Sequence, residues 1–190
     1  MGRIQTIFSV LLLVVLLFLT TQVGAAQKRY KRTIEDYKIP DVTLINQRRE
    51  QVAMAEWMNS DAPVILDFVY ATCTTICPVL SISFSTLQKK LGEDAKDIRF
   101  ISITIDPEND SPEIMGEYLD RYQAKPGWDF FTGSRKDIDA TMHAFDAYVP
   151  NKMAHYPLTL MRSPKTGKWV RIYGLIGSKD FLREYEALEK

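Results

Sequence analysis

Cysteine and histidine are scarce in this chain of 190 residues, which contains two of each. Two cysteines allow one intramolecular bridge at most, so a fold stapled by several disulfides is excluded. Basic and acidic side chains balance at 24 each, so no basic excess indicates a nucleic-acid partner. Internal repeats are absent, and the length suits one domain preceded by a leader.

Charge is missing from the N-terminal stretch between Ile4 and Gln27. Its apolar core, Ile7 to Leu19, has the length of a signal-peptide core and is short for a membrane span. The small residues Val23-Gly24-Ala25 suit a signal peptidase. Residues 1–26 are therefore predicted to be a signal peptide or a membrane anchor, with both forms left open, and the domain is predicted to be exported.

A basic cluster after this stretch argues against export. Only Arg3 and the amino terminus precede the apolar core, so the positive-inside rule favours a cytoplasmic position for the cluster. The domain would then face a reducing compartment. Export remains our prediction, with residues 27–38 as a polar tether and residues 39–190 as the folded domain. The cluster consists of Lys28, Arg29, Lys31 and Arg32.

The folded domain alternates between strand-like and helix-like segments. Val64 to Tyr70 is typical of a strand buried on both faces, and the carboxylate of Asp67 within it needs a partner. Residues 80–91 alternate like a strand but also form an apolar helical face, and Pro78 favours the helix. Other strands are expected at 40–45, 98–105 and 130–131, helices after Ser111, Ser134 and Ser178, a helical turn at 53–59, and a hairpin of 158–161 with 169–172.

This order predicts a single α/β domain with parallel strands and an added antiparallel pair. Ligands of such sheets bind beyond the carboxyl ends of the strands. Cys73, Cys77 and Asp106 all fall at such ends. We therefore expect the functional site at this edge of the sheet.

The two cysteines stand where a strand gives way to a helix. Pro78 suits the first helical position, which makes Cys77 the predicted N-cap and places Cys73 in the preceding loop. The helix dipole favours a thiolate there, the form that attacks disulfides and binds soft metals. A structural disulfide closing about five residues would contribute only roughly 2 kcal/mol. We interpret the C-x-x-x-C pair as a redox or metal site.

These segments together resemble the Sco/SenC family of thioredoxin-like copper proteins, which serve cytochrome oxidase assembly. The resemblance extends from about Ile39 to the C-terminus and implies a thioredoxin-like fold, with a central mixed sheet flanked by helices. It rests on Ile39-Pro40-Asp41-Val42-Thr43-Leu44, the C-x-x-x-C-P segment Phe68 to Pro78, the D-P-x-x-D-x-P-E segment within Ser102 to Glu113, Phe131-Thr132-Gly133-Ser134, and His155.

Carried over residue by residue, the resemblance implies one copper ion, Cu(I) or Cu(II), held by Cys73, Cys77 and His155. The same two cysteines would also form a redox-active disulfide. Two positions depart from the family pattern. Thr74 stands where many members have proline, and Ala154 where many have aspartate, which removes a carboxylate that tunes affinity in metal sites.

The resemblance implies a copper metallochaperone on the periplasmic side of the inner membrane, which favours a protein without enzymatic turnover but leaves a thiol–disulfide oxidoreductase activity open. Its partner would be the copper-site subunit of cytochrome oxidase or another copper enzyme. The alternative is a thiol–disulfide oxidoreductase that reduces the cysteines of a partner's copper site and is itself served by a thioredoxin-like reductant. A sensor or interaction module is a third hypothesis.

Other polar and soft side chains have plainer interpretations. A lone histidine beside a proline is most often solvated, so the ligand role of His155 depends on the resemblance, and His143 is interpreted as a surface residue. Asp106 is predicted to cap a turn rather than support the site. Asp67 either tunes the cysteines or bonds nearby backbone. Core or surface filling is the interpretation for Met142, Met153 and Met161.

Overall fold

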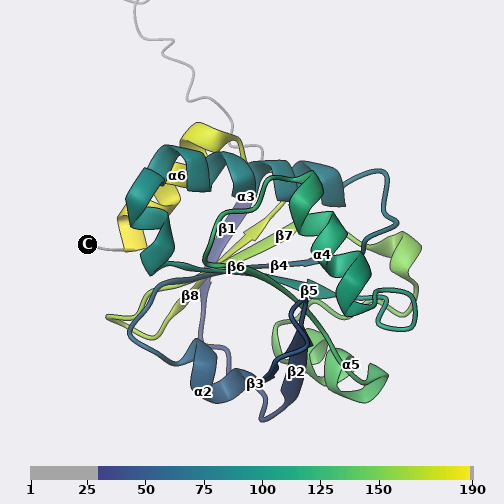
Figure 1. Ribbon diagram of the computed structural model, residues 1–190. Coiled ribbons are helices and arrows are strands. Elements are labelled where there is room, and N and C mark those ends of the chain that lie inside the picture. Colours follow the sequence, from purple (N-terminus) through teal and green to yellow (C-terminus); the bar gives the residue numbers. More distant parts are fainter. Residues whose placement is uncertain (1–29, 189–190) are drawn as a thin grey trace, which may run out of the picture.

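The computed structural model describes residues 30–188 and shows a mixed sheet of eight strands in the order β1-β8-β7-β4-β5-β6-β2-β3 (Figure 1). The strands are β1 Lys31–Glu35, β2 Thr43–Asn46, β3 Gln51–Ala53, β4 Val64–Val69, β5 Arg99–Thr104, β6 Trp128–Thr132, β7 Leu158–Arg162 and β8 Trp169–Tyr173. The helices are α2 Met54–Met58, α3 Cys77–Leu91, α4 Pro112–Arg121, α5 Arg135–Ala144 and α6 Ser178–Leu188, with short 3-10 helices η1 Gly92–Asp97 and η2 Lys152–Ala154.

The centre of the sheet is parallel, and its margins are antiparallel. β4, β5 and β6 run parallel, whereas β7 pairs antiparallel with β4 and β2 pairs antiparallel with β6. All six residues of β4 are buried, as expected for a continuous apolar run with cover on both faces. The predicted α/β fold with a central mixed sheet and the predicted hairpin of β7 and β8 are confirmed.

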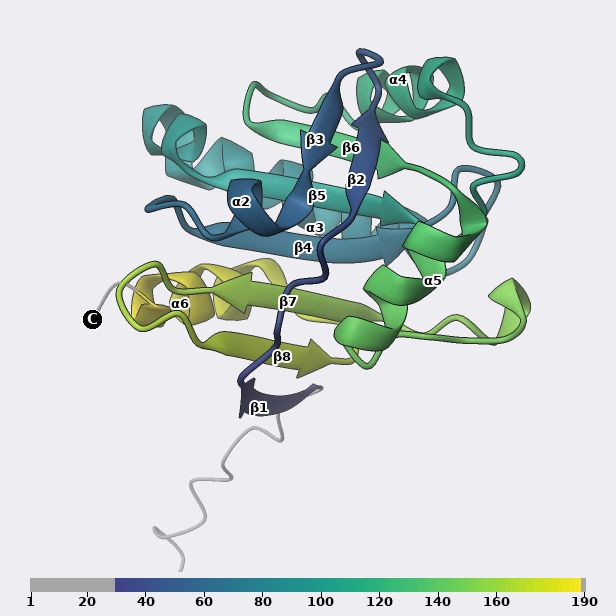
Figure 2. The same ribbon diagram turned by 90° about the horizontal axis from the view of Figure 1, so that it is seen from below.

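Helices cover both faces of the sheet. α3, α4 and α6 lie on one face, and α2 and α5 lie on the other (Figures 1 and 2). The ring of Phe84 on α3 packs against Phe100 of β5 and Phe181 of α6, with centroids 5.6 and 6.0 Å apart. Leu80 and Leu87 are buried beside it. The helical interpretation of residues 80–91 is therefore confirmed. Their buried apolar side chains share one face because an α-helix has a period of 3.6 residues.

The prediction for the start of α3 was wrong by one residue. Cys77 is the first helical residue and Ile76 occupies the N-cap position, without a side-chain hydrogen bond to the helix start. Ile76 already has helical backbone angles, φ −90° and ψ −33°, so the turn begins before Pro78. Backbone N–H groups at this end have no partner inside the helix. They are available to the cysteine loop.

The N-terminal predictions meet the structure only in part. The predicted leader, residues 1–26, lies outside the described residues. Within residues 30–188, no helix has the length and apolar character needed to cross a membrane.

The predicted tether, residues 27–38, includes a strand, and this part of the prediction was wrong. β1 pairs antiparallel with β8 at the outer edge of the sheet. Its polar composition is ordinary for an edge strand, where charges discourage further pairing. Glu184 on α6 accepts hydrogen bonds from the Tyr30 hydroxyl and the Arg32 guanidinium, each at 2.7 Å. Each contact joins residues about 150 positions apart in the sequence, so local composition does not reveal it.

Replacing Glu184 with glutamine should loosen β1. The change removes the buried negative charge that Arg32 faces, at an expected cost of about 1 to 2 kcal/mol. Hydrogen exchange at residues 31–35 should accelerate more than exchange in β4. The exposed Glu186→Gln on the same helix is the control. Equal exchange rates in both variants would contradict the anchoring role of Glu184.

Candidate functional site

The dithiol lies at the carboxyl end of β4, in the loop that leads into α3. Both cysteines are free thiols; Cys73 is 7% exposed and Cys77 is fully buried. The Cys73 backbone N–H donates to the Tyr70 carbonyl at 3.1 Å, which closes a tight turn after the strand. Cys73 Sγ lies 3.7 Å from the Thr75 hydroxyl. The structure therefore brings the two predicted cysteines together as one dithiol.

The two thiols differ in acidity. Burial opposes ionisation of Cys73, but hydrogen bonds from the Cys77 thiol, the backbone N–H groups of Cys77 and Thr75, and the Thr75 hydroxyl outweigh it and lower its pKa to about 7. Burial raises the pKa of Cys77 far above its ordinary value, and its hydrogen bond to Cys73 adds to the shift. Cys73 is therefore the more acidic of the two thiols, and the Cys77 thiol donates the hydrogen bond between them.

His155 follows η2 and reaches the same edge of the sheet from another loop. Burial lowers its pKa to about 4, although the Phe68 backbone carbonyl accepts a hydrogen bond from the imidazole. Its Nε2 is buried and has no hydrogen-bond partner among the described residues. The imidazole is therefore neutral at neutral pH. Its Nε2 lone pair is left without a hydrogen-bond donor in the part of the chain that the structure describes.

Tyr70 contacts both halves of the site. Its ring lies edge-on to His155, with centroids 6.4 Å apart. Burial raises the pKa of Tyr70 to about 12, and its hydrogen bond to Cys73 contributes. Across residues 30–188, no three His, Cys, Asp or Glu side chains are close enough together to hold a metal ion as they stand. The two cysteines and His155 thus share one region, but they do not surround a common point.

Asp110, which the sequence analysis did not single out, ties the cysteine loop to β5. Its carboxylate is fully buried and accepts from the Ala71 backbone N–H at 3.2 Å and from the Thr104 hydroxyl. The Thr104 hydroxyl in turn accepts from the Asp106 backbone N–H at 2.9 Å. The sequence signal was available in the Asp-Pro-Glu-Asn-Asp run directly after a buried strand.

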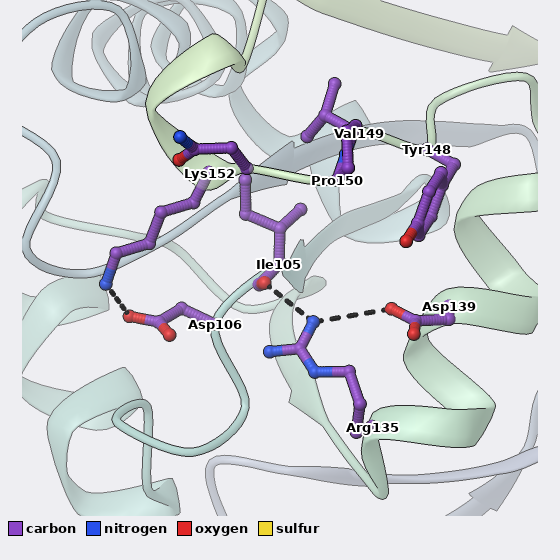
Figure 3. A pocket seen from close by; sticks show the side chains of 9 residues that line it. Ile105, Asp106, Arg135, Asp139, Tyr148, Val149, Pro150 and Lys152 are labelled. Atoms are coloured by element: carbon purple, nitrogen blue, oxygen red, sulfur yellow. Dashed lines mark hydrogen bonds and ion pairs between the residues drawn. The ribbon is translucent and has the colours of Figure 1, made fainter.

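Asp106 forms the predicted turn and also holds the histidine loop. Its carbonyl accepts from the N–H groups of Asn109 and Asp110, which confirms the turn. Its carboxylate pairs with Lys152 Nζ at 2.5 Å (Figure 3). Because Lys152 begins η2, the Asp110, Thr104 and Asp106 chain connects the cysteine loop to the His155 loop.

A pocket of about 450 Å³ is lined in part by the Asp106–Lys152 pair. Figure 3 shows Arg135 reaching into it and hydrogen-bonding the Ile105 carbonyl at 3.1 Å. Arg135 also pairs with Glu108 and Asp139. The charged side chains that line the pocket are thus paired with protein groups.

Asp67 lies fully buried in β4, and neither carboxylate oxygen has a hydrogen-bond partner within the described part of the chain, so the bond to nearby backbone that the sequence left open is not formed. The other alternative, an effect on the cysteines, is supported, because the charge of Asp67 adds to the effect of burial in raising the pKa of Cys77. Burial raises its pKa to about 7, and the Ser102 hydroxyl opposes the shift. The Ser102 hydroxyl oxygen already accepts from Trp128 Nε1 at 3.0 Å. The other predictions hold: His143 is exposed, and Met142 and Met161 fill the core.

The fold and the dithiol define a thioredoxin-like protein with its cysteine pair at a strand-to-helix junction. Residues 31–167 match the family described as SCO1/SenC, so the chain belongs to that family. The SCO1 protein homolog of Bacillus subtilis is 33% identical over 117 residues, which span 60% of this chain and 60% of that relative.

Solved structures share the architecture. BsSco, described as a member of the Sco family of cytochrome c oxidase assembly proteins with a disulfide switch, aligns with a TM-score of 0.68 and 26% identity over 82% of this chain and 95% of its own. ScoI of Bradyrhizobium japonicum, solved with copper bound, aligns with a TM-score of 0.64 and 22% identity over 77% of this chain and 96% of its own.

Replacing Asp67 with asparagine should stabilise the reduced protein more at alkaline than at acid pH. An unfolded aspartate has a pKa of about 3.9, and burial raises that of Asp67 to about 7. Between these values the folded state binds more protons than the unfolded state, so the wild type loses stability as pH rises. The stability gained by the variant should grow by at most about 4 kcal/mol between pH 4 and 8.

Urea denaturation at both pH values measures this difference. Titration of His155 opposes the trend in both proteins and cancels in the comparison. The exposed Asp41→Asn serves as the matched control. A stability gain that is independent of pH would show that Asp67 is ionised throughout the range.

Proposed function

We propose that this protein binds one copper ion through Cys73, Cys77 and His155 and delivers it to the copper site of cytochrome oxidase or of another copper enzyme. Copper binding and delivery would take place on the periplasmic side of the inner membrane. The observation that carries the proposal is the Nε2 of His155, which is buried and has no hydrogen-bond partner within residues 30–188, at the edge of the sheet that holds the dithiol. Membership of the SCO1/SenC family and the copper-bound ScoI relative support it.

The donor set suits a soft ion. Two thiolates and an imidazole favour Cu(I), which tolerates a low coordination number. His155 stays neutral down to mildly acid pH because burial lowers its pKa to about 4. Cys77 must lose the proton it shares with Cys73, so binding releases protons and weakens as pH falls. Cys73 needs little further activation.

Delivery requires that the ligands separate easily. Tyr70 contacts both Cys73 and His155, and the two loops are joined through the Asp106–Lys152 ion pair. A three-ligand ion leaves a position open to a ligand from the recipient. Withdrawal of His155 would then leave the ion on the dithiol while the recipient's side chains replace one sulfur after the other.

Titration of the reduced protein with Cu(I) against a competing chelator tests the proposal. Wild type should bind one ion, and Cys73→Ser, Cys77→Ser and His155→Ala should each weaken binding at least about tenfold, because each removes one donor. His143→Ala is the control, since His143 is exposed and stacks on Tyr148. An affinity for Cu(I) that is the same in His155→Ala and in wild type would contradict the three-ligand site.

A thiol–disulfide oxidoreductase is the second candidate, favoured by the free dithiol and the low pKa of Cys73. The Cys73 thiolate would attack a partner's disulfide, form a mixed disulfide and release one partner thiolate. Cys77 would then attack Cys73 Sγ, forming the intramolecular disulfide and releasing the second partner thiol. A thioredoxin-like reductant would return the pair to the dithiol.

This second candidate depends on the cysteines alone. With oxidised glutathione as the probe, Cys77→Ser should stop at a mixed disulfide on Cys73, detectable by mass spectrometry. Cys73→Ser should be inactive because Cys77 is buried and its pKa is raised. His155→Ala should react like wild type. Loss of exchange in His155→Ala would contradict a purely dithiol reaction.

A further inference from the structure

Met153 differs from the other methionines of residues 30–188. Its side chain is 75% exposed. The others, Met54, Met58, Met115, Met142 and Met161, are at most 1% exposed. Met153 lies in η2, two residues before His155. An exposed thioether beside a soft-metal site offers a ligand that an aliphatic side chain lacks.

The Met153 sulfur and the Cys73 sulfur meet at one hydroxyl group. Met153 Sδ lies 3.9 Å from Tyr70 Oη, and the same hydroxyl hydrogen-bonds Cys73. A hydroxyl has one proton, which serves one acceptor at a time. Both sulfurs therefore lie within reach of one hydroxyl oxygen, and the Met153 side chain is flexible enough to adjust the position of its sulfur.

The backbone of Met153 is held by a hydrogen bond, while its side chain is largely exposed and contacts the Tyr70 hydroxyl. Its N–H donates to Asn151 Oδ1 at 2.9 Å. The preceding residue, Lys152, pairs with Asp106 and places its ammonium 5.3 Å from the centroid of the Tyr70 ring. The thioether is therefore kept at the mouth of the site, between solvent and the less exposed Cys73.

We propose that Met153 is an entry ligand for Cu(I), which captures the ion together with Cys73 and passes it inward to Cys77 and His155. The inference rests on the copper binding proposed above. A thioether is neutral and soft, so it binds without losing a proton. A thiolate and an imidazole then displace it. Copper stays Cu(I) throughout, and the proton shared by the thiols leaves to solvent as both sulfurs bind.

Stopped-flow loading of the full-length reduced protein from the acetonitrile complex of Cu(I) tests the role of Met153. Met153→Leu keeps the size and apolar character but removes the sulfur. We expect its second-order loading rate to fall about tenfold, with the final affinity unchanged. Met161→Leu, in the core, is the matched control and should load at the wild-type rate.

A reduced set of ligands isolates the entry site. In the Cys77→Ser, His155→Ala double variant, Cys73 and Met153 remain, and X-ray absorption should show Cu(I) with two sulfur neighbours. Adding Met153→Leu should remove one of them. Circular dichroism confirms that each variant folds.

The outcomes separate this inference from the proposed function. Failure of the wild type to bind Cu(I) would overturn both. Normal binding with equal loading of wild type and Met153→Leu would overturn the entry role alone. Slow loading in Met153→Ala that leucine restores would identify an apolar contact instead, and it would also overturn the entry role.

Discussion

The hydrogen bonds that Cys77 gives to Cys73 are the interaction on which the site depends. They exist because α3 begins at Cys77 without a capping side chain, which leaves its N–H facing the preceding loop. That loop is short, because β4 ends at Val69 and α3 begins at Cys77. The fold thus sets two chemically identical side chains apart. One is ready to ionise near neutral pH, and the other keeps its proton.

A second feature of the site is the network that connects the cysteine loop to the His155 loop, two segments far apart in the sequence. Asp110 and Thr104 hold the cysteine loop, and Asp106 holds η2 through Lys152. His155, whose Nε2 has no hydrogen-bond partner among the described residues, is thereby kept beside Tyr70, the residue that also contacts Cys73. The proposed copper delivery would benefit from such an arrangement, because a site that is complete before the ion arrives would also be slow to release it.

A carboxyl group, that of Asp67, is buried in the strand that leads to this site. It has no hydrogen-bond partner in the described region. Burial raises the pKa of this carboxyl group to about 7. Its charge also raises the pKa of Cys77, so the protonation of strand and dithiol is coupled.

The sequence by itself determined the α/β class, the central strands and the helix after the cysteines, because burial on two faces and helical periodicity are local patterns. It also placed Cys73 and Cys77 at the junction between a buried strand and a helix, although the helix begins at Cys77, one residue before the predicted start. Tertiary structure alone decided that β1 joins the sheet, that Asp110 and Lys152 connect the loops, and that Met153 faces solvent beside Tyr70. Those outcomes depend on contacts between residues far apart in the chain, which no local pattern encodes.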